Sequence, residues 1–220
     1  MASRSSSDVW PAVHEERRAL LRDLDGLPDA AWQTPSSCPG WTVHDVLAHL
    51  VDTALTTRLG FLRAMITARF DFDRGNTAGV RKHRGKSPAE TLEAFRSVQH
   101  RTSGPPAPRA TRLVEAVVHG EDIRRPLGIV RAYPPEPVVL ALVHQVETSV
   151  KVGGGRELVD GLRLAAADGS FGHGRGDEVR GSTLALLLAV SGRPVRDDEL
   201  SGPGAGTLRG RLSAQLFGNH

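Results

Sequence analysis

Apolar residues recur with helical spacing through about the first 130 residues of this 220-residue chain, and short alternating segments follow. Between residues 8 and 25 they lie among charges at the spacing of an amphipathic helix, which Gly26 and Pro28 end. The apolar positions are Val9, Val13, Leu20, Leu21 and Leu24. We interpret this segment as the first helix of a bundle.

Two further helices have start signals in the sequence. Thr42 occupies an N-cap position and Asp45 follows it as the third helical residue, after the turn-rich stretch P-S-S-C-P-G-W. We expect this helix to extend to about Phe70. Residues 71–86 are polar, contain glycine and show no period, so we predict a long loop of the kind that often borders a site. The sequence S-P-A-E at residues 87–90 then predicts a new helix.

The sequence changes character after Y-P-P at residues 133–135, which places a domain boundary between about residues 130 and 155. We predict domains at 1–133 and 134–220. In the second domain we expect a helix over 138–152, strand-like alternation around a D-G turn within 161–174, a strand at 177–181, a helix over 182–190 and an edge strand at 206–212. The expected fold class is a helical bundle followed by a small α+β domain.

Composition excludes several classes of function. Lys and Arg number 28 against 25 Asp and Glu, and aromatic residues make up only 5%. This small, dispersed surplus of positive charge does not favour nucleic-acid binding. The single cysteine, Cys38, excludes an intramolecular disulfide and is typical of a reducing compartment. With no signal-peptide core and no membrane-length apolar run, we expect a cytoplasmic protein, monomeric or homodimeric, that binds no membrane.

Glu115 and His119 indicate a possible metal site. They are four residues apart on a stretch with a helical pattern, which Pro126 and Gly128 close, so a carboxylate and an imidazole share one face. His49 lies on the apolar side of an earlier helix and is the natural third ligand. Two imidazoles and one carboxylate would bind zinc or a similar divalent ion and leave one position open. The simpler interpretation of the pair is two hydrogen-bonded neighbours on a helix.

Other polar residues are weaker candidates. Asp122 could orient His119 or help to bind a cofactor, although it could equally be an ordinary exposed acid. Arg74 and Asn76 could meet an acidic cosubstrate, Arg74 as a catalytic residue and Asn76 as a binding residue, or could simply be solvated. We expect His44, in the first turn of its helix, to be solvated or to cap that helix rather than to bind metal.

Two motifs resemble those of the mycothiol-dependent maleylpyruvate isomerase family. They are P-S-x-C-P-G-W-T-V-H-D-V-L-A-H-L and E-x-x-x-H-G-x-D-I-R-x-P-L-G. The resemblance continues through L-R-L-A-A-A-D, E-V-R-G and L-x-x-x-V-S-G-R-P in the second domain. It implies a DinB-like metal-binding four-helix bundle followed by a small sterol-carrier-like α/β domain. It also implies that the metal ligands are His49, Glu115 and His119.

The resemblance implies mycothiol as a cosubstrate and a small electrophile as its partner. A metal-activated thiolate would then support isomerisation or S-transfer. We also expect Arg193, from the second domain, to act at the site as a catalytic residue. Two alternatives stay open: metal-assisted hydrolysis with the same ligands, and a metal-containing protein that only binds a small molecule. Hydrolysis would proceed without thiol, and a binding protein would turn over no electrophile.

Overall fold

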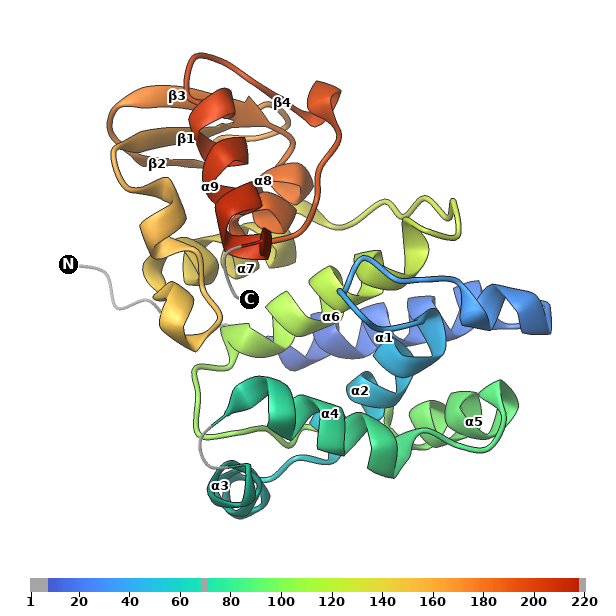
Figure 1. Ribbon diagram of the computed structural model, residues 1–220. Coiled ribbons are helices and arrows are strands. Elements are labelled where there is room, and N and C mark those ends of the chain that lie inside the picture. The colour runs from blue at the N-terminus through green and yellow to red at the C-terminus, as the bar shows by residue number, and fades with distance from the viewer. Residues whose placement is uncertain (1–7, 69–70, 218–220) are drawn as a thin grey trace. The chain divides into compact units, whose positions relative to one another are not determined.

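The computed structural model describes residues 8–68 and 71–217, and these fall into two compact units, Met1–Arg131 and Ala132–His220. Figure 1 shows the helices and strands of both units. The described residues form helices throughout the first unit and a small four-stranded sheet with helices in the second. None of the helices in the described ranges is long and apolar enough to cross a membrane.

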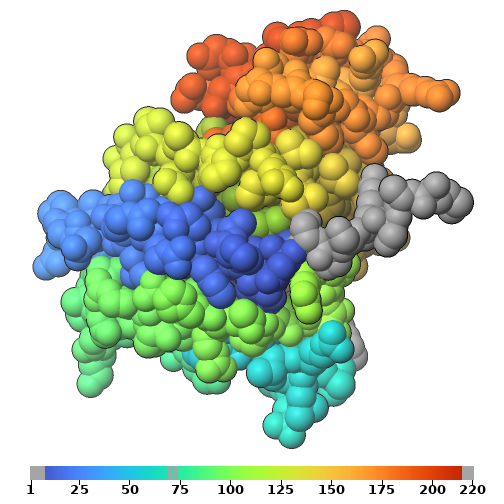
Figure 2. Space-filling model, turned by 180° about the vertical axis from the view of Figure 1, so that it is seen from behind, coloured from blue at the N-terminus to red at the C-terminus, as the bar shows by residue number. Residues whose placement is uncertain are grey.

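The first unit is built from α-helices and one short 3-10 helix. Their bounds are α1 (Trp10–Leu24), η1 (Asp29–Gln33), α2 (Val43–Leu55), α3 (Arg58–Thr67), α4 (Phe72–His83), α5 (Pro88–Val98) and α6 (Ala110–Arg124). The helix α2 packs against α4, α5 and α6, and α1 packs against α5 and α6. Figure 2 shows α1, in blue, lying along the green segment that includes α5.

The buried core of this unit comes from the apolar faces of four of these helices and from η1. Val13 of α1 and Phe95 of α5 are almost completely buried, as is Leu47 of α2. The buried residues of the core cluster are Leu20, Leu21, Leu24, Trp32, Val43, Val46, Leu47, Leu50, Val51, Ala54, Leu92, Phe95, Val98 and Ile123. Each buried aliphatic or aromatic side chain of this size contributes about 1.5–3 kcal/mol to folding.

Both predicted helix starts are confirmed. The Thr42 hydroxyl accepts a hydrogen bond from the Asp45 backbone N–H, and the Asp45 carboxylate accepts one from the Thr42 N–H at 2.9 Å. The Ser87 hydroxyl likewise accepts a hydrogen bond from the Glu90 N–H, with Pro88 as the first helical residue. Such caps satisfy backbone donors that the first turn leaves without partners.

The predicted extent of α2 is wrong, because the helix ends at Leu55 and α3 begins at Arg58. Thr56 and Thr57 have extended backbone angles, and the Thr57 hydroxyl accepts a hydrogen bond from the Gly60 N–H that starts α3. Two adjacent β-branched residues that can cap a helix therefore interrupt the helix at this point. The predicted end at Phe70 lies outside the described residues.

The predicted loop at 71–86 is also wrong, because most of it is the helix α4. Asp71 caps this helix by accepting a hydrogen bond from the Arg74 N–H at 3.0 Å. Packing against α2 stabilises α4 despite its polar sequence. Gly79 permits the close approach, since a Cβ at that position would overlap the Asp52 carboxylate of α2.

The second unit contains a four-stranded sheet in the order β2-β1-β3-β4. Strand β1 pairs in parallel with β3, whereas the β1–β2 and β3–β4 pairs are antiparallel. The helix α8 packs against α7, β1 and β3, and α9 packs against β3. The bounds are α7 (Pro135–Glu147), η2 (Val150–Val152), η3 (Arg156–Val159), β1 (Leu162–Ala166), β2 (Gly172–Gly174), β3 (Asp177–Gly181), α8 (Thr183–Val190), η4 (Asp197–Glu199), β4 (Leu200–Ser201) and α9 (Ala205–Phe217).

Two predictions in this unit need correction. The helix expected over 138–152 ends at Glu147, and a separate 3-10 turn follows. The edge strand expected at 206–212 is part of the helix α9. Leu208 and Leu212 are both buried, and a spacing of four residues places two side chains on one face of either a helix or a strand. The D-G turn, the strand at 177–181 and the helix of 182–190 are confirmed, with Ser182 as the N-cap of α8.

The close approach at Gly155 gives a test of packing in the second unit. A Cβ at Gly155 would overlap the carbonyl oxygen of Val190, at the end of α8, whereas one at Gly169 would meet nothing within 4 Å. We expect Gly155→Ala to lower the free energy of unfolding by about 1–3 kcal/mol, as overpacking does. Gly169→Ala should change it by less than about 0.5 kcal/mol. Urea unfolding of both variants measures the difference, and equal stabilities would contradict this packing.

Candidate functional site

The predicted residues His49 and His119 lie side by side although they come from different helices. His49 is on α2 and His119 on α6, and their ring centroids are 4.8 Å apart in an edge-to-face arrangement. The Trp41 ring, from the turn before α2, lies 5.1 Å from the His49 ring. His49 is only 6% exposed. The structure therefore brings two imidazoles together in an environment largely closed to water.

Asp122 is hydrogen-bonded to one of these imidazoles. Its carboxylate oxygen Oδ2 lies 2.9 Å from Nδ1 of His119, and Asp122 is 1% exposed. Because an ionised carboxylate only accepts hydrogen bonds, Nδ1 of His119 is the donor and Nε2 is the nitrogen with a free lone pair. This is the arrangement in which a carboxylate commonly supports a ligand histidine.

Glu115 lies one turn before His119 and links α6 to α2. Its Oε1 accepts a hydrogen bond from the Thr53 hydroxyl at 2.7 Å, and its Oε2 lies 2.9 Å from Nη1 of Arg112. Arg17 of α1 is close enough to Glu115 and Arg112 for their charges to affect its pKa. Burial lowers the pKa of Arg17, the Glu115 charge raises it and the Arg112 charge lowers it. Glu115 is thus held between a hydroxyl and buried cations.

A cavity of about 500 Å³ adjoins these residues. It is lined by His49, Asp52 and Thr53 from α2, by Arg112 and Glu115 from α6, and by parts of α3 and α4. Its volume lies in the range that small-molecule sites occupy. The segment predicted as a loop therefore does border this cavity, but as the helix α4.

The donor chemistry at His49, Glu115 and His119 fits a divalent metal. Each oxygen of the Glu115 carboxylate retains a lone pair beyond its present contact, and Nε2 of His119 is available. Within the described ranges, however, no three His, Cys, Asp or Glu side chains are already grouped around a common point as a metal site. The Glu115 carboxylate faces Thr53 and Arg112. Ligation of a metal by these three residues stays a prediction.

The other predicted residues lie in different surroundings. Asn76 is on α4 and lines the cavity. Arg74 is also on α4, but it is exposed and is not among the residues that line the cavity. Arg193 belongs to the second unit, where its guanidinium donates a hydrogen bond to the Ser191 carbonyl at 3.1 Å. The roles predicted for Arg74, Asn76, Asp122 and Arg193 stay predictions.

Sequence reasoning did not single out four polar residues of this region. Thr53 and Arg112 fix Glu115, and Asp52 lies 3.4 Å from the His83 ring on the wall of the cavity. Burial raises the pKa of Asp52, and the His83 charge opposes this change. The only sequence signal was spacing: Thr53 is four residues after His49, and Arg112 is three residues before Glu115.

His44 was expected to be solvated or to cap its helix, and this expectation is wrong. The side chain is 1% exposed and packs against Trp32, with 6.1 Å between ring centroids. Its Nε2 lies 2.7 Å from the Thr91 hydroxyl of α5. Burial, followed by the nearby Arg84 charge, lowers the pKa of His44. Val43 before it, and Leu47 and Ala48 one turn later in α2, are also buried, so His44 lies in the core.

Comparisons with known proteins give a family match for part of the chain. Residues 13–104 match the family described as the mycothiol maleylpyruvate isomerase N-terminal domain. This segment of the chain is therefore similar to that family. The matching range includes α2 and therefore His49, whereas Glu115 and His119 lie beyond it.

Sequence relatives and solved structures extend this comparison. Two uncharacterised proteins from two strains of Mycobacterium tuberculosis are 30% identical over 159 residues, covering 57% of this chain and 60% of each relative. The chain thus spans about 60% of the length of these curated relatives. Crystal structures of the mycothiol-dependent maleylpyruvate isomerase and of a histidine-to-alanine mutant superpose with TM-scores of 0.60 and 0.61. They cover 88% of this chain and 91% of theirs at 16% identity, which shows a shared fold.

The lowered pKa of His44 predicts a dependence of stability on pH. In the unfolded chain His44 binds a proton near its ordinary pKa of 6.5, whereas in the fold it stays neutral to lower pH. The unfolded state therefore binds more protons below about pH 6.5, and the free energy of unfolding falls on acidification. We expect His44→Gln to make this fall shallower between pH 7 and 5 by up to about 1.4 kcal/mol per pH unit. Urea unfolding across that range measures it, and an unchanged slope would refute the assignment.

Proposed function

We propose that this protein is a metal-dependent enzyme that uses mycothiol, a low-molecular-weight thiol, to isomerise a small electrophile or to transfer sulfur to it. The observation that supports it most strongly is the contact between the His49 and His119 rings, with Glu115 one turn before His119. The family of residues 13–104 and the shared fold with an isomerase whose name includes mycothiol support the same function.

In this proposal His49, Glu115 and His119 hold a divalent metal, with zinc as the ion that two imidazoles and a carboxylate favour. When bound, the metal would lower the pKa of the thiol and so supply a thiolate at neutral pH. Asp122 holds the His119 ring in one orientation through Nδ1. Thr53 and Arg112 hold the Glu115 carboxylate, which limits its rotation.

The substrate in this proposal occupies the cavity of about 500 Å³ beside His49. Asn76 lines it and would hydrogen-bond a polar group of the thiol or the electrophile. Arg74, on the same helix as Asn76, would meet an acidic group of either molecule. The apolar wall formed by Phe61 and Met65 of α3 would exclude water from the reacting atoms.

The ligand set can be tested by metal content. We expect purified protein to contain about one equivalent of zinc per chain, and His49→Ala and His119→Ala each to lose most of it, because removal of one ligand leaves too few donors. His100→Ala is the matched control, since His100 is an exposed histidine of the same unit. Elemental analysis measures all four proteins. Full metal content in His119→Ala would exclude this ligand set.

Asp122 gives a second test, of orientation rather than ligation. Asp122→Asn keeps the shape of the side chain but replaces the carboxylate that accepts a hydrogen bond from Nδ1–H of His119. We expect the zinc affinity to fall by about 10- to 100-fold, as loss of such a supporting carboxylate does. Competition with a chelator of known affinity measures the change. Unaltered zinc affinity in a folded variant would show that Asp122 has no such role.

Thiol dependence tests the function itself. Cobalt-substituted protein should show a thiolate-to-metal charge-transfer band on addition of mycothiol, and the zinc protein should consume an electrophile such as maleylpyruvate only when mycothiol is present. His49→Ala should lose both responses. Turnover without thiol would favour hydrolysis instead. An unchanged cobalt spectrum together with no turnover would favour a protein that only binds small molecules.

A further inference from the structure

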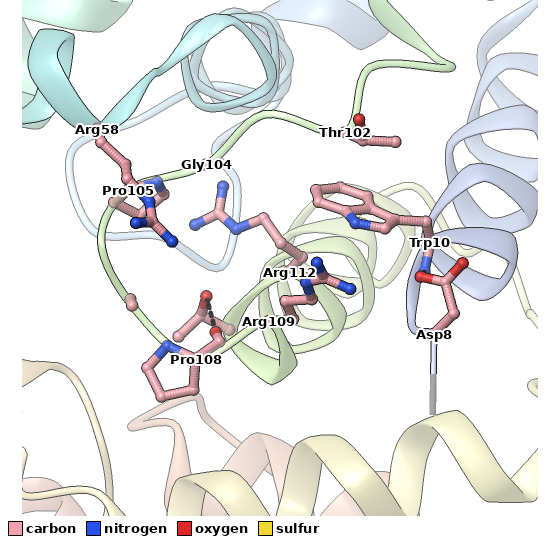
Figure 3. Close-up of a pocket in the computed structure, with 11 residues that line it drawn as sticks. Asp8, Trp10, Arg58, Thr102, Gly104, Pro105, Pro108, Arg109 and Arg112 are labelled. Atoms are coloured by element: carbon pink, nitrogen blue, oxygen red, sulfur yellow. Dashed lines mark hydrogen bonds between the residues drawn. The ribbon is translucent and has the colours of Figure 1, made fainter. Parts of the chain in front are cut away.

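A second cavity, of about 390 Å³, lies near the start of α6 and is lined by three arginines. Arg58 is the first residue of α3, Arg109 is the N-cap residue of α6 and Arg112 lies in the first turn of α6. Figure 3 shows the guanidinium groups of Arg58 and Arg112 directed into the space beside Pro105. The Trp10 indole forms another part of the lining.

Arg112 is a buried cation whose hydrogen-bonding capacity is not used up. It is 8% exposed, and no described residue accepts a hydrogen bond from its buried Nε. Its known contact is with Oε2 of Glu115, 2.9 Å from Nη1. A guanidinium has five N–H donors, so one carboxylate oxygen leaves it largely unsatisfied in a place where water is scarce.

The other two arginines add charge that the surrounding protein does not neutralise. Among the described parts of the chain, neither the Arg58 nor the Arg109 side chain makes a hydrogen bond or an ion pair. Among the residues that the structure describes, Asp8 is the only acidic one in the lining, and its Oδ1 accepts a hydrogen bond from the Trp10 backbone N–H at 3.3 Å. Three guanidinium groups, set against the Asp8 carboxylate and the Glu115 carboxylate that pairs with Arg112, leave the cavity positively charged.

The start of α6 makes this arrangement unusual. No side chain caps the helix and its first turn contains no acidic residue. The positive end of the helix dipole faces this cavity, where Arg109 and Arg112 add further positive charge. Cations at a helix N-terminus are unfavourable, whereas an anion there is favourable. A bound anion would neutralise the helix end and offset the positive charge that these arginines add.

We infer that this cavity binds the carboxylate group of a small organic acid. A planar guanidinium matches a carboxylate with two parallel hydrogen bonds. The lining includes none of His49, Glu115 and His119, but Arg112 and Pro105 line both this cavity and the one beside His49. An acid anchored here is therefore next to the proposed reaction site. Assigning that acid to the substrate rests on the proposed function, whereas the binding itself does not.

Trp10 provides a direct readout for the test. Full-length protein is titrated with succinate while tryptophan fluorescence is recorded, with isothermal calorimetry in parallel. We expect saturable binding at one site, weakened about tenfold or more in Arg58→Ala and in Arg109→Ala, because each variant loses charge-assisted hydrogen bonds to the carboxylate. Arg109→Lys should recover part of the loss. Arg63→Ala, which removes an exposed arginine of the same helix as Arg58, should bind as the wild type does.

Two results would contradict the proposed anion site. Absence of saturable succinate binding, or equal weakening in Arg63→Ala, would overturn the site. Inorganic phosphate that competes at the same arginines and binds more tightly than succinate would overturn the carboxylate assignment in favour of a phosphate group. These measurements involve neither zinc nor thiol, so the anion site can fail while the proposed function stands, and the reverse.

Discussion

Burial of α2 on several sides is the constraint on which the first unit depends. The helix is covered by η1, α4, α5 and α6, and its apolar residues form the centre of the core. Burial leaves its polar residues little access to water, and an unsatisfied polar group in such a place costs several kcal/mol. Each must therefore have a partner inside the protein. His44 contacts Thr91, Asp52 contacts His83 and Thr53 contacts Glu115.

These partners come from three different helices, so the polar residues of α2 also specify how the helices pack. Thr91 fixes α5, His83 fixes α4 and Glu115 fixes α6 relative to α2. The candidate site is therefore part of the packing of the core rather than an addition to its surface. A buried polar network of this kind contributes to a unique arrangement only when each member has a partner.

Local signals in the sequence predicted local structure well. The capping residues Thr42 and Ser87 each form the expected hydrogen bonds, because a cap depends on side chains only three residues apart. The expected extent of α2 and the loop at 71–86 were wrong, because contacts between residues distant in the sequence help to determine these segments. The sequence of α4 is polar and contains glycine, and the contact of Gly79 with Asp52 that favours a helix there is long-range.

The site shows the same division between local and long-range information. The spacing of Glu115 and His119 placed them on one face of α6, and the structure agrees. The contact between His49 and His119 needs a particular rotation of both helices, which spacing alone does not specify. The hydrogen bond from Thr53 to Glu115 also depends on the relative rotation of α2 and α6. The sequence did not indicate a role for Arg112, because burial distinguishes this residue from the other arginines near it in the chain.

Along α6, the residues of both proposed sites form one stripe. Arg112, Glu115, His119 and Asp122 follow one another at spacings of three or four residues, so they lie along one side of the helix. The stripe begins with a cation and ends at the imidazole and its carboxylate. Arg112 and His119 are seven residues apart, which corresponds to a rise of about 10 Å along the axis. A molecule whose carboxylate is bound by Arg112 while its reactive carbon lies beside the histidines must therefore be several bonds long. The helix geometry thus favours an extended organic acid over a compact one.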